Sequence, residues 1–304
     1  MTRKEIIRSL KGVFPALVTP FNRQGKIEEG LFRENLQKLT GIGLSGFLVA
    51  GSTGEAPYLA ESERLRLVEL AREIVRPPEI VMAGTGLEST EATVRLSREA
   101  VARGADALLV LTPNYFKSRM NADALVAHYQ AVAGKVKRPV IVYSIPQFTG
   151  LHVEPSTIGR LSQIPNVAAL KDSSGDFRFL RAVLRQVRPE FPVLTGGALI
   201  FYQALRAGAA GAVLGKTNFV PELCLSLYQA FLHGRKKTAL EFQERLSLLA
   251  RAITIPYGVP GVKAALDLSG YGGGFPRAPL APLGSAARKL VASALRDARA
   301  GLEF

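Results

Sequence analysis

The sequence contains few of the side chains that form disulfides and metal sites. Its 304 residues include one cysteine, Cys224, and three histidines, His128, His152 and His233. A single cysteine excludes an internal disulfide bond, which suits a protein of the reducing cytosol. The histidines are scattered along the chain, and we assign none of them to a site.

Long apolar runs are also missing. No uninterrupted apolar stretch reaches the roughly 18 residues that a membrane-spanning helix needs. The first residues, MTRKEIIRSLKGVF, lack the apolar segment of a secretory signal. We therefore expect a cytoplasmic protein without a membrane partner.

Acidic residues are outnumbered, with 25 Asp and Glu against 39 Lys and Arg, for a formal charge of +14. Such a balance attracts anions and can indicate a nucleic-acid partner. The densest basic clusters, at 135–138 and 235–237, lie at predicted helix ends without interleaved aromatic residues, which favours a solvated surface and no nucleic-acid partner. A non-catalytic barrel that binds DNA in a salt-sensitive way is the alternative.

Short apolar runs alternate with amphipathic stretches along most of the chain, whose composition is 47% hydrophobic. The runs are Val13–Val18, Gly46–Ala50, Ile80–Ala83, Ala107–Leu111, Val140–Tyr143, Val167–Leu170, Val193–Thr195 and Ala212–Leu214. Helical periodicity occupies the intervals, including Glu61–Val75, Glu88–Ala102, Ala122–Ala133 and Asp176–Val187. Eight such units predict an α/β fold, a closed (β/α)₈ TIM barrel over residues 1–220. Residues 221–304 predict a C-terminal helical extension packed on it, with Ser269–Pro282 as a loop.

An open doubly wound sheet is the alternative architecture, but no glycine fingerprint opens the first strand–helix turn. Local signals mark the helix boundaries. Helix starts are expected at Ser89 or Thr90, Asn121 and Ser174. Glycines expected just after helices are Gly43, Gly104, Gly134 and Gly208.

In such a barrel the active site lies at the carboxyl ends of the strands. The segments there are Thr19, Gly51–Glu55, Gly84–Gly86, Thr112–Tyr115, Tyr143–Pro146, Lys171–Ser173, Thr195–Gly197 and Gly215–Asn218. They concentrate hydroxyls, backbone N–H groups, a tyrosine and a lysine. They contain no His/Asp/Glu cluster, so we expect no metal.

Lys171 ends the sixth apolar run. Strand alternation places Val167, Ala169, Lys171 and Ser173 on one face, with small residues below the amine. An amine in apolar surroundings favours its neutral form, which attacks a ketone to give a protonated Schiff base. The alternative is a structural lysine whose ammonium group extends to solvent.

Tyr143 ends the preceding strand and is placed to relay protons near Lys171, unless it is an ordinary core tyrosine. The Gly51–Glu55 loop offers two hydroxyls and several N–H groups, which can hold a carboxylate. By itself such a glycine-containing turn is common.

Six motifs at these strand ends occur in the order of a known family. They are GVFPALVTPF (12–21), GSTGE (51–55), GTG (84–86), LTPNYF (111–116), YSIPQFTG (143–150) and LKDSSGD (170–176). From about residue 12 to about residue 280 the chain resembles the dihydrodipicolinate synthase/N-acetylneuraminate lyase family of pyruvate-dependent class I aldolases.

The resemblance implies a set of residue roles. Lys171 would be the Schiff-base lysine and Tyr143 the acid/base, with Tyr115 completing a proton relay in a neighbouring subunit. Ser52 and Thr53 would bind the pyruvate carboxylate, with Thr53 counted among the catalytic residues. Further substrate contacts are expected at Ser173, Val213, Phe148 and Gly196. The resemblance implies no cofactor, small oxo acids such as pyruvate as ligands, and a homotetramer built as a dimer of dimers.

Within the family, several stretches resemble the 4-hydroxy-2-oxoglutarate aldolases. They are LESTEATV (87–94), YGVPGVKAALDLSGYGGGFPRAPL (257–280) and KDSSGD (171–176). Phe148 stands where the dihydrodipicolinate synthases carry an arginine for the carboxylate of aspartate semialdehyde. We therefore expect reversible cleavage of a 4-hydroxy-2-oxo acid, best 4-hydroxy-2-oxoglutarate, to pyruvate and an aldehyde such as glyoxylate. The alternatives are condensation of pyruvate with aspartate semialdehyde and cleavage of a 2-keto-3-deoxy sugar acid.

Overall fold

The central element is a parallel sheet of eight strands, ordered β1-β8-β7-β6-β5-β4-β3-β2 in a computed structural model that describes residues 1–302. β1 and β2 meet through a parallel bridge between Ala16 and Leu48, and Leu17 N–H donates to the Leu48 carbonyl over 2.9 Å. The strands are β1 (Gly12–Pro15), β2 (Gly46–Val49), β3 (Ile80–Gly84), β4 (Ala107–Leu111), β5 (Val140–Ser144), β6 (Val167–Asp172), β7 (Val193–Thr195) and β8 (Gly211–Leu214). The predicted (β/α)₈ barrel is confirmed.

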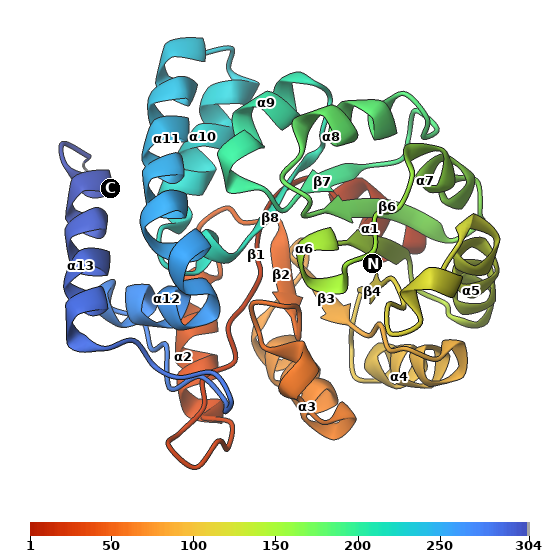
Figure 1. Ribbon diagram of the computed structural model, residues 1–304, viewed down its shortest axis with the longest axis horizontal. Coiled ribbons are helices and arrows are strands. Elements are labelled where there is room, and N and C mark those ends of the chain that lie inside the picture. Colours follow the sequence, from red (N-terminus) through yellow and green to blue (C-terminus); the bar gives the residue numbers. More distant parts are fainter. Residues whose placement is uncertain (303–304) are drawn as a thin grey trace.

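Helices surround this barrel (Figure 1). The helices before and between the strands are α1 (Arg3–Ser9), α2 (Glu29–Leu39), α3 (Glu61–Ile74), α4 (Thr90–Ala102), α5 (Ala122–Lys135), α6 (Pro146–Thr149), α7 (Pro155–Ser162), α8 (Phe177–Leu184) and α9 (Phe201–Arg206). Those after β8 are α10 (Pro221–Leu232), α11 (Lys236–Leu249), α12 (Ile255–Leu268) and α13 (Ser285–Arg299). The short 3₁₀ turns are η1 (Ala56–Tyr58), η2 (Lys117–Arg119), η3 (Ala198–Ile200) and η4 (Gly215–Asn218), and η5 (Ala250–Thr254) is a π-helical turn. Within residues 1–302, no helix combines the length and apolarity needed to cross a membrane.

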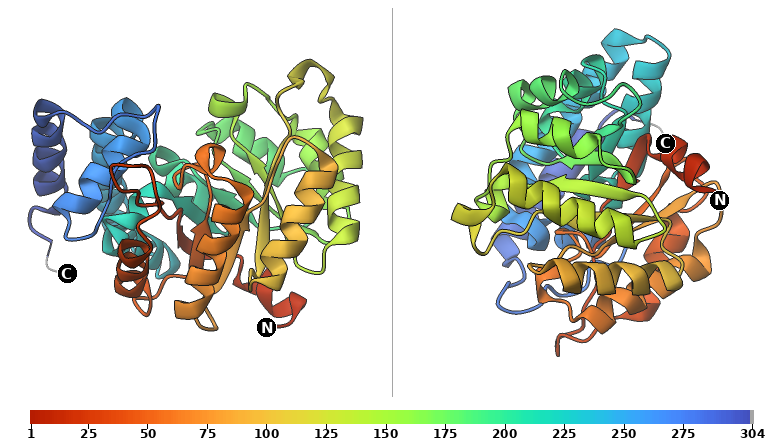
Figure 2. Two further views of the ribbon diagram at one scale, coloured as in Figure 1. Left: turned by 90° about the horizontal axis from the view of Figure 1, so that it is seen from below. Right: turned by 90° about the vertical axis from the view of Figure 1, so that its right-hand side faces the viewer.

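Strand residues alternate between two cores, which explains why the strands are continuous apolar runs. One set fills the barrel interior and includes Phe14, Leu48, Met82, Leu109 and Ile141. Their neighbours along the chain face the helices and include Val13, Phe47, Val81, Leu108 and Val140. α1 lies at the amino-terminal end of the strands (Figure 2). Its Ile6, together with Leu10 just after it, is fully buried against the barrel interior, so α1 closes that end.

Two of the expected helix starts and two of the expected glycines are confirmed. Ser89 and Asn121 accept the N–H groups of Ala92 and Ala124, and Gly104 and Gly208, just after α4 and α9, have φ of 99° and 107°. Three expectations are wrong. α2 ends at Leu39, so Gly41 (φ 78°) follows its C-cap Thr40 directly and Gly43 lies farther along. α8 is capped by Asp176, not Ser174, because the Asp176 carboxylate reaches two N–H groups of the first turn. Gly134 lies inside α5, since the helix continues to Lys135.

After β8 the chain forms α10, which contacts both β1 and α11, and then the helices α11 to α13 gathered on one flank of the barrel (blue, Figure 1). The expected division at residue 220 falls just before α10 and stays a prediction. The expected loop from Ser269 is confirmed, and it runs to α13. The sequence predicts helices at Glu222–His233, Lys237–Ile253 and Ala286–Ala300, and α12 has no counterpart among them, because Gly258 (φ 52°) and Pro260 interrupt its helical pattern.

Candidate active site

Lys171 and Tyr143 lie side by side at the carboxyl ends of β6 and β5. They are register partners, and the Lys171 Nζ lies 4.1 Å from the centroid of the Tyr143 ring. Both side chains are almost fully buried, at 3% and 4% exposure. The expected juxtaposition of amine and phenol is confirmed.

A β-bulge shapes the floor beneath Lys171. Val140 pairs with Val167, but Ile141 pairs with Ala169, so Ala168 has no partner on β5. Val167 consequently packs in the outer core, while Ala168 and Ala169 both belong to the inner one. The expectation that Val167 shares the inward face is therefore wrong, because the bulge breaks the alternation. Two alanines, not a valine, lie below the amine.

The Gly51–Glu55 loop brings its hydroxyls to the same place. The Ser52 and Tyr143 hydroxyls share a hydrogen bond of 3.2 Å. Thr53 lies beside the end of β8, since a Cβ built on Gly215 would come within 3.3 Å of its Oγ1. The residues flanking the loop, Ala50 (φ 52°) and Glu55 (φ 59°), have left-handed backbone conformations, which cost such residues on the order of 1 kcal/mol each. Strain of this kind persists only where surrounding contacts hold it.

Ser173 and Gly196 form the opposite wall. A Cβ on Gly196 would lie 2.0 Å from the Ser173 Oγ, so only glycine admits the serine at this distance. Ser173 N–H donates to the Ser144 carbonyl over 2.9 Å, and Gln147 Nε2 donates to the Ser173 carbonyl over 2.5 Å. Gln147 was not expected at the site. Its position after Pro146, on the turn α6, is the signal that could have found it.

Val213 and Asp172 lie on opposite sides of the barrel wall. Val213 belongs to the inner core of the barrel, as its expected role requires. Asp172, which lies in an expected strand-end segment but had no expected role, is fully buried and accepts bonds from the N–H and Oγ of Ser174. Burial raises the pKa of Asp172 to about 6. Its two bonds to Ser174 hold the turn at Ser173–Ser174. Because Asp172 follows Lys171 on the strand, its side chain points away from the barrel interior.

Tyr115 and Phe148 are separate from the buried group. Their side chains are 77% and 72% exposed. The Tyr115 ring packs edge-on against the ring of Phe116. The backbone N–H of Tyr115 donates to the Glu88 carboxylate over 2.9 Å. A single chain, in residues 1–302, does not bring the Tyr115 phenol to Tyr143. The expected relay through Tyr115 is therefore not formed within one chain.

The arrangement has the parts of an imine-forming site. A buried amine can condense with a ketone, and an adjacent phenol bonded to a serine can relay protons. A cavity of about 60 Å³ adjoins the Ser52–Tyr143 pair. Within the described residues, no three His, Cys, Asp or Glu side chains gather as metal ligands would.

The fold and these residues define a (β/α)₈ barrel with a lysine–tyrosine site at its strand ends. The sequence model of the dihydrodipicolinate synthetase family matches residues 9–298. The 4-hydroxy-tetrahydrodipicolinate synthase of Methanothrix thermoacetophila is 35% identical over 274 residues, 90% of this chain and 92% of the relative. The chain therefore belongs to the dihydrodipicolinate synthetase family, and it is an enzyme of the pyruvate-dependent class I aldolase and lyase type.

Solved structures agree with this assignment. A structure described as the first monomeric dihydrodipicolinate synthase variant has a TM-score of 0.90 and 29% identity, covering 97% of this chain and 98% of its own. The YagE protein of E. coli K12 in complex with pyruvate has a TM-score of 0.89 and 25% identity, covering 95% and 98%.

Proposed function

We propose that Lys171 forms a Schiff base with pyruvate and that the enzyme makes or breaks a carbon–carbon bond next to that imine. The observation that carries this proposal is the buried contact between the Lys171 amine and Tyr143, whose hydroxyl is bonded to Ser52. The pyruvate complex of YagE supports the choice of oxo acid.

In the cleavage direction, the Lys171 amine attacks the ketone carbon and water leaves, giving a protonated imine. Tyr143 takes the proton of the 4-hydroxyl, directly or through Ser52. The C3–C4 bond then breaks, and its electron pair enters the imine to form an enamine. Protonation at C3 and addition of water release pyruvate and restore the amine. Condensation is the reverse at the bond-forming step.

The remaining walls orient the oxo acid. The Ser52 and Thr53 hydroxyls and the N–H groups of their loop hold the carboxylate, because clustered donors of this kind bind anions. Val213 and Gly196 border the carbon chain, and Ser173 faces the far end of the substrate.

For the second substrate, the comparisons support condensation with aspartate semialdehyde better than 4-hydroxy-2-oxoglutarate cleavage. Relatives of this chain, including that of Phenylobacterium zucineum at 35% identity over 290 residues, are named 4-hydroxy-tetrahydrodipicolinate synthase. One observation favours the cleavage reaction as a second candidate. Phe148 lies exposed on α6, directly after β5, and its ring offers a semialdehyde carboxylate no charged partner. Such a missing partner is worth about 1.5–3 kcal/mol. Sugar-acid cleavage remains an alternative without an observation in its favour.

We further propose that Tyr115 acts in a neighbouring subunit of a cytoplasmic homotetramer. Its exposed phenol, on a turn that Glu88 holds, supports this. Because a related protein is described as monomeric, light scattering at several protein concentrations is the required measurement. Under this proposal, Tyr115→Phe lowers turnover in the assembled enzyme only.

Borohydride reduction in the presence of pyruvate tests the Schiff base. One pyruvate-derived mass is expected on the peptide bearing Lys171, and none in Lys171→Ala. Lys216 provides the matched control. It is a second buried lysine just after a strand, and burial lowers its pKa to about 8, but its Nζ donates to Thr254 over 2.7 Å, outside the inner core. Labelling that survives Lys171→Ala, or that disappears in Lys216→Ala, refutes the assignment. A panel of aldehydes and 4-hydroxy-2-oxo acids then identifies the second substrate.

A further inference from the structure

A buried ion pair lies directly behind the Gly51–Glu55 loop. The Nζ of Lys263, on α12, lies 2.6 Å from the Glu55 Oε1, and the two side chains are 2% and 1% exposed. The same ammonium donates to the carbonyls of Thr19 and Phe275 over 2.7 and 2.6 Å. Two ammonium donors therefore bond to carbonyls, and the contact with Glu55 Oε1 is an ion pair without hydrogen-bond geometry. The pair joins the end of β1, the loop after β2 and the C-terminal extension.

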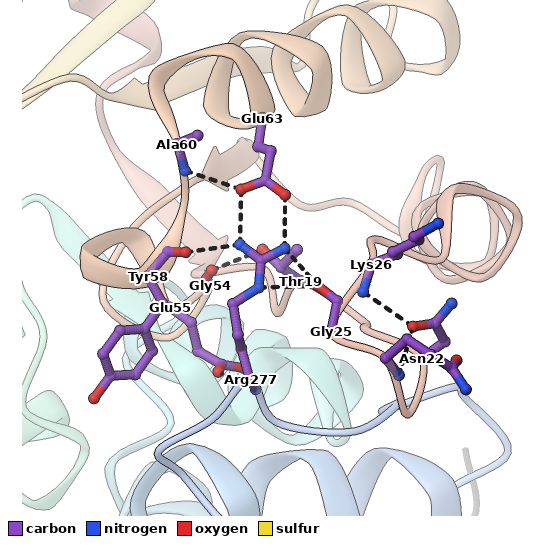
Figure 3. Close-up of polar contacts among 11 residues, drawn as sticks. Thr19, Asn22, Gly25, Lys26, Gly54, Glu55, Tyr58, Ala60, Glu63 and Arg277 are labelled. Atoms are coloured by element: carbon purple, nitrogen blue, oxygen red, sulfur yellow. Dashed lines mark hydrogen bonds and ion pairs between the residues drawn. The ribbon is translucent and has the colours of Figure 1, made fainter.

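Arg277 completes this connection, and Figure 3 shows its guanidinium between three segments. Its Nε and Nη2 donate to the Gly25 carbonyl, and its Nη1 donates to the Tyr58 carbonyl over 2.7 Å. The remaining two N–H groups form a bidentate pair with Glu63, at 2.6 and 2.7 Å. All five donors of the fork are satisfied, so the backbone of Arg277 is held firmly.

That backbone acts on the loop itself. The Arg277 N–H donates to the Glu55 Oε2 over 2.8 Å, so both carboxylate oxygens of Glu55 are held by the extension. Glu55 has the strained left-handed conformation that ends the loop. The carbonyl before it, of Gly54, accepts a 2.7 Å bond from the Thr19 hydroxyl. The loop that carries Ser52 and Thr53 is thus fixed from behind by contacts remote in sequence.

A buried ion pair contributes little net stability, because desolvation of the two charges offsets their attraction. Its contribution here is geometric. We propose that Glu55, Lys263 and Arg277 are positioning residues through which the C-terminal extension sets the loop's affinity for the pyruvate carboxylate. The inference rests on the proposed function, since it assigns the carboxylate to Ser52 and Thr53.

The test uses Glu55→Gln, Lys263→Met and the double variant in the full-length protein. Borohydride trapping at increasing pyruvate gives the half-saturating concentration for the Lys171 adduct, and turnover at saturating pyruvate is measured beside it. Each single variant should raise half-saturation on the order of tenfold, equivalent to about 1.4 kcal/mol, and lower saturated turnover much less. The double variant should raise half-saturation by less than the product of the two single-variant factors, because the two charges share one interaction.

Arg288→Met is the matched control, since Arg288 forms an exposed ion pair with Asp267 in the same extension. It should leave half-saturation unchanged. A merely structural pair would lower the melting temperature and leave half-saturation at the wild-type value, and that result overturns the proposal. If the charge variants fail to fold, Arg277→Lys keeps the charge but loses the bidentate pair with Glu63, and unchanged half-saturation there also overturns it. A wild type that forms no adduct contradicts the proposed function instead.

Discussion

Replacing Gly196 by alanine should distort the candidate site through one identifiable contact. The added Cβ would lie 2.0 Å from the Ser173 Oγ, 2.9 Å from its Cβ and 3.2 Å from its Cα. Rotation of the Ser173 hydroxyl relieves the first contact only. The others persist because Ser173 N–H is bonded to Ser144, and Gly196 N–H to the Asp172 carbonyl over 2.6 Å. The ends of β6 and β7 must therefore separate.

Overpacking of this kind costs about 1–3 kcal/mol. If the strain falls on the reacting geometry, kcat/KM drops by roughly ten- to hundredfold. The assay is thermal unfolding together with kcat/KM for the identified substrate pair. Gly134→Ala is the control. Gly134 is the penultimate residue of α5, and a Cβ there meets nothing within 4 Å, so this variant should be neutral or slightly stabilising.

A second substitution that removes most of the Ser173 side chain tests this contact directly. Adding Ser173→Gly to Gly196→Ala removes the two closest atoms, Oγ and Cβ, and leaves only the 3.2 Å contact with the Cα, so the melting temperature should recover toward that of Ser173→Gly alone. A Gly196→Ala enzyme with wild-type stability and kcat/KM would refute the packing of these strand ends. So would a double variant that is no more stable than Gly196→Ala.

Three further predictions concern single residues. Tyr143→Phe should still form the pyruvate imine but turn over about 10²-fold or more slowly, because a proton relay is lost; near-normal turnover would make Tyr143 a core residue. Phe148→Arg should shift the ratio of kcat/KM values toward aspartate semialdehyde by about tenfold, equal to about 1.4 kcal/mol, and an unchanged ratio would place Phe148 away from the second substrate. Burial lowers the pKa of His128 to about 4. As the pH falls from 6.5 toward 4, the imidazole is therefore protonated in the unfolded chain but not in the folded one. The free energy of unfolding should drop by about 3 kcal/mol over this range. His128→Phe should flatten that part of the denaturation-versus-pH curve, and an equal slope in both proteins would contradict the assignment.

The barrel was predictable because burial on both faces gives each strand an apolar run that can be recognised locally. Lys171 and Tyr143 were predictable for a related reason, since a polar residue that ends such a run lies at the catalytic edge. The bulge at Ala168 was not, because an extra residue in a strand depends on its partner strand and leaves no local signal.

The C-terminal part shows the same limit. In α12, Gly258 and Pro260 break the helical pattern of the sequence. The helix forms because it packs against neighbouring parts of the extension, including α13. The pairing of Glu55 with Lys263 joins two segments far apart in sequence. The sequence does not indicate which acidic residue pairs with which basic residue. Sequence reasoning thus identified the side chains of the candidate site and missed the contacts that hold its loop.

The closed end of the barrel has a consequence for the order of events. With Ile6 and Leu10 sealing the amino-terminal side, Lys171 is approached, in the described part of the chain, from the strand carboxyl ends. A molecule bonded to Lys171 lies deeper than anything that docks after it. Under the proposed function, the oxo acid must therefore enter first and leave last, while the aldehyde exchanges above it. An inert aldehyde analogue lodged at the mouth would then slow release of pyruvate already bound, and a chase experiment would record it as a longer lifetime of the adduct.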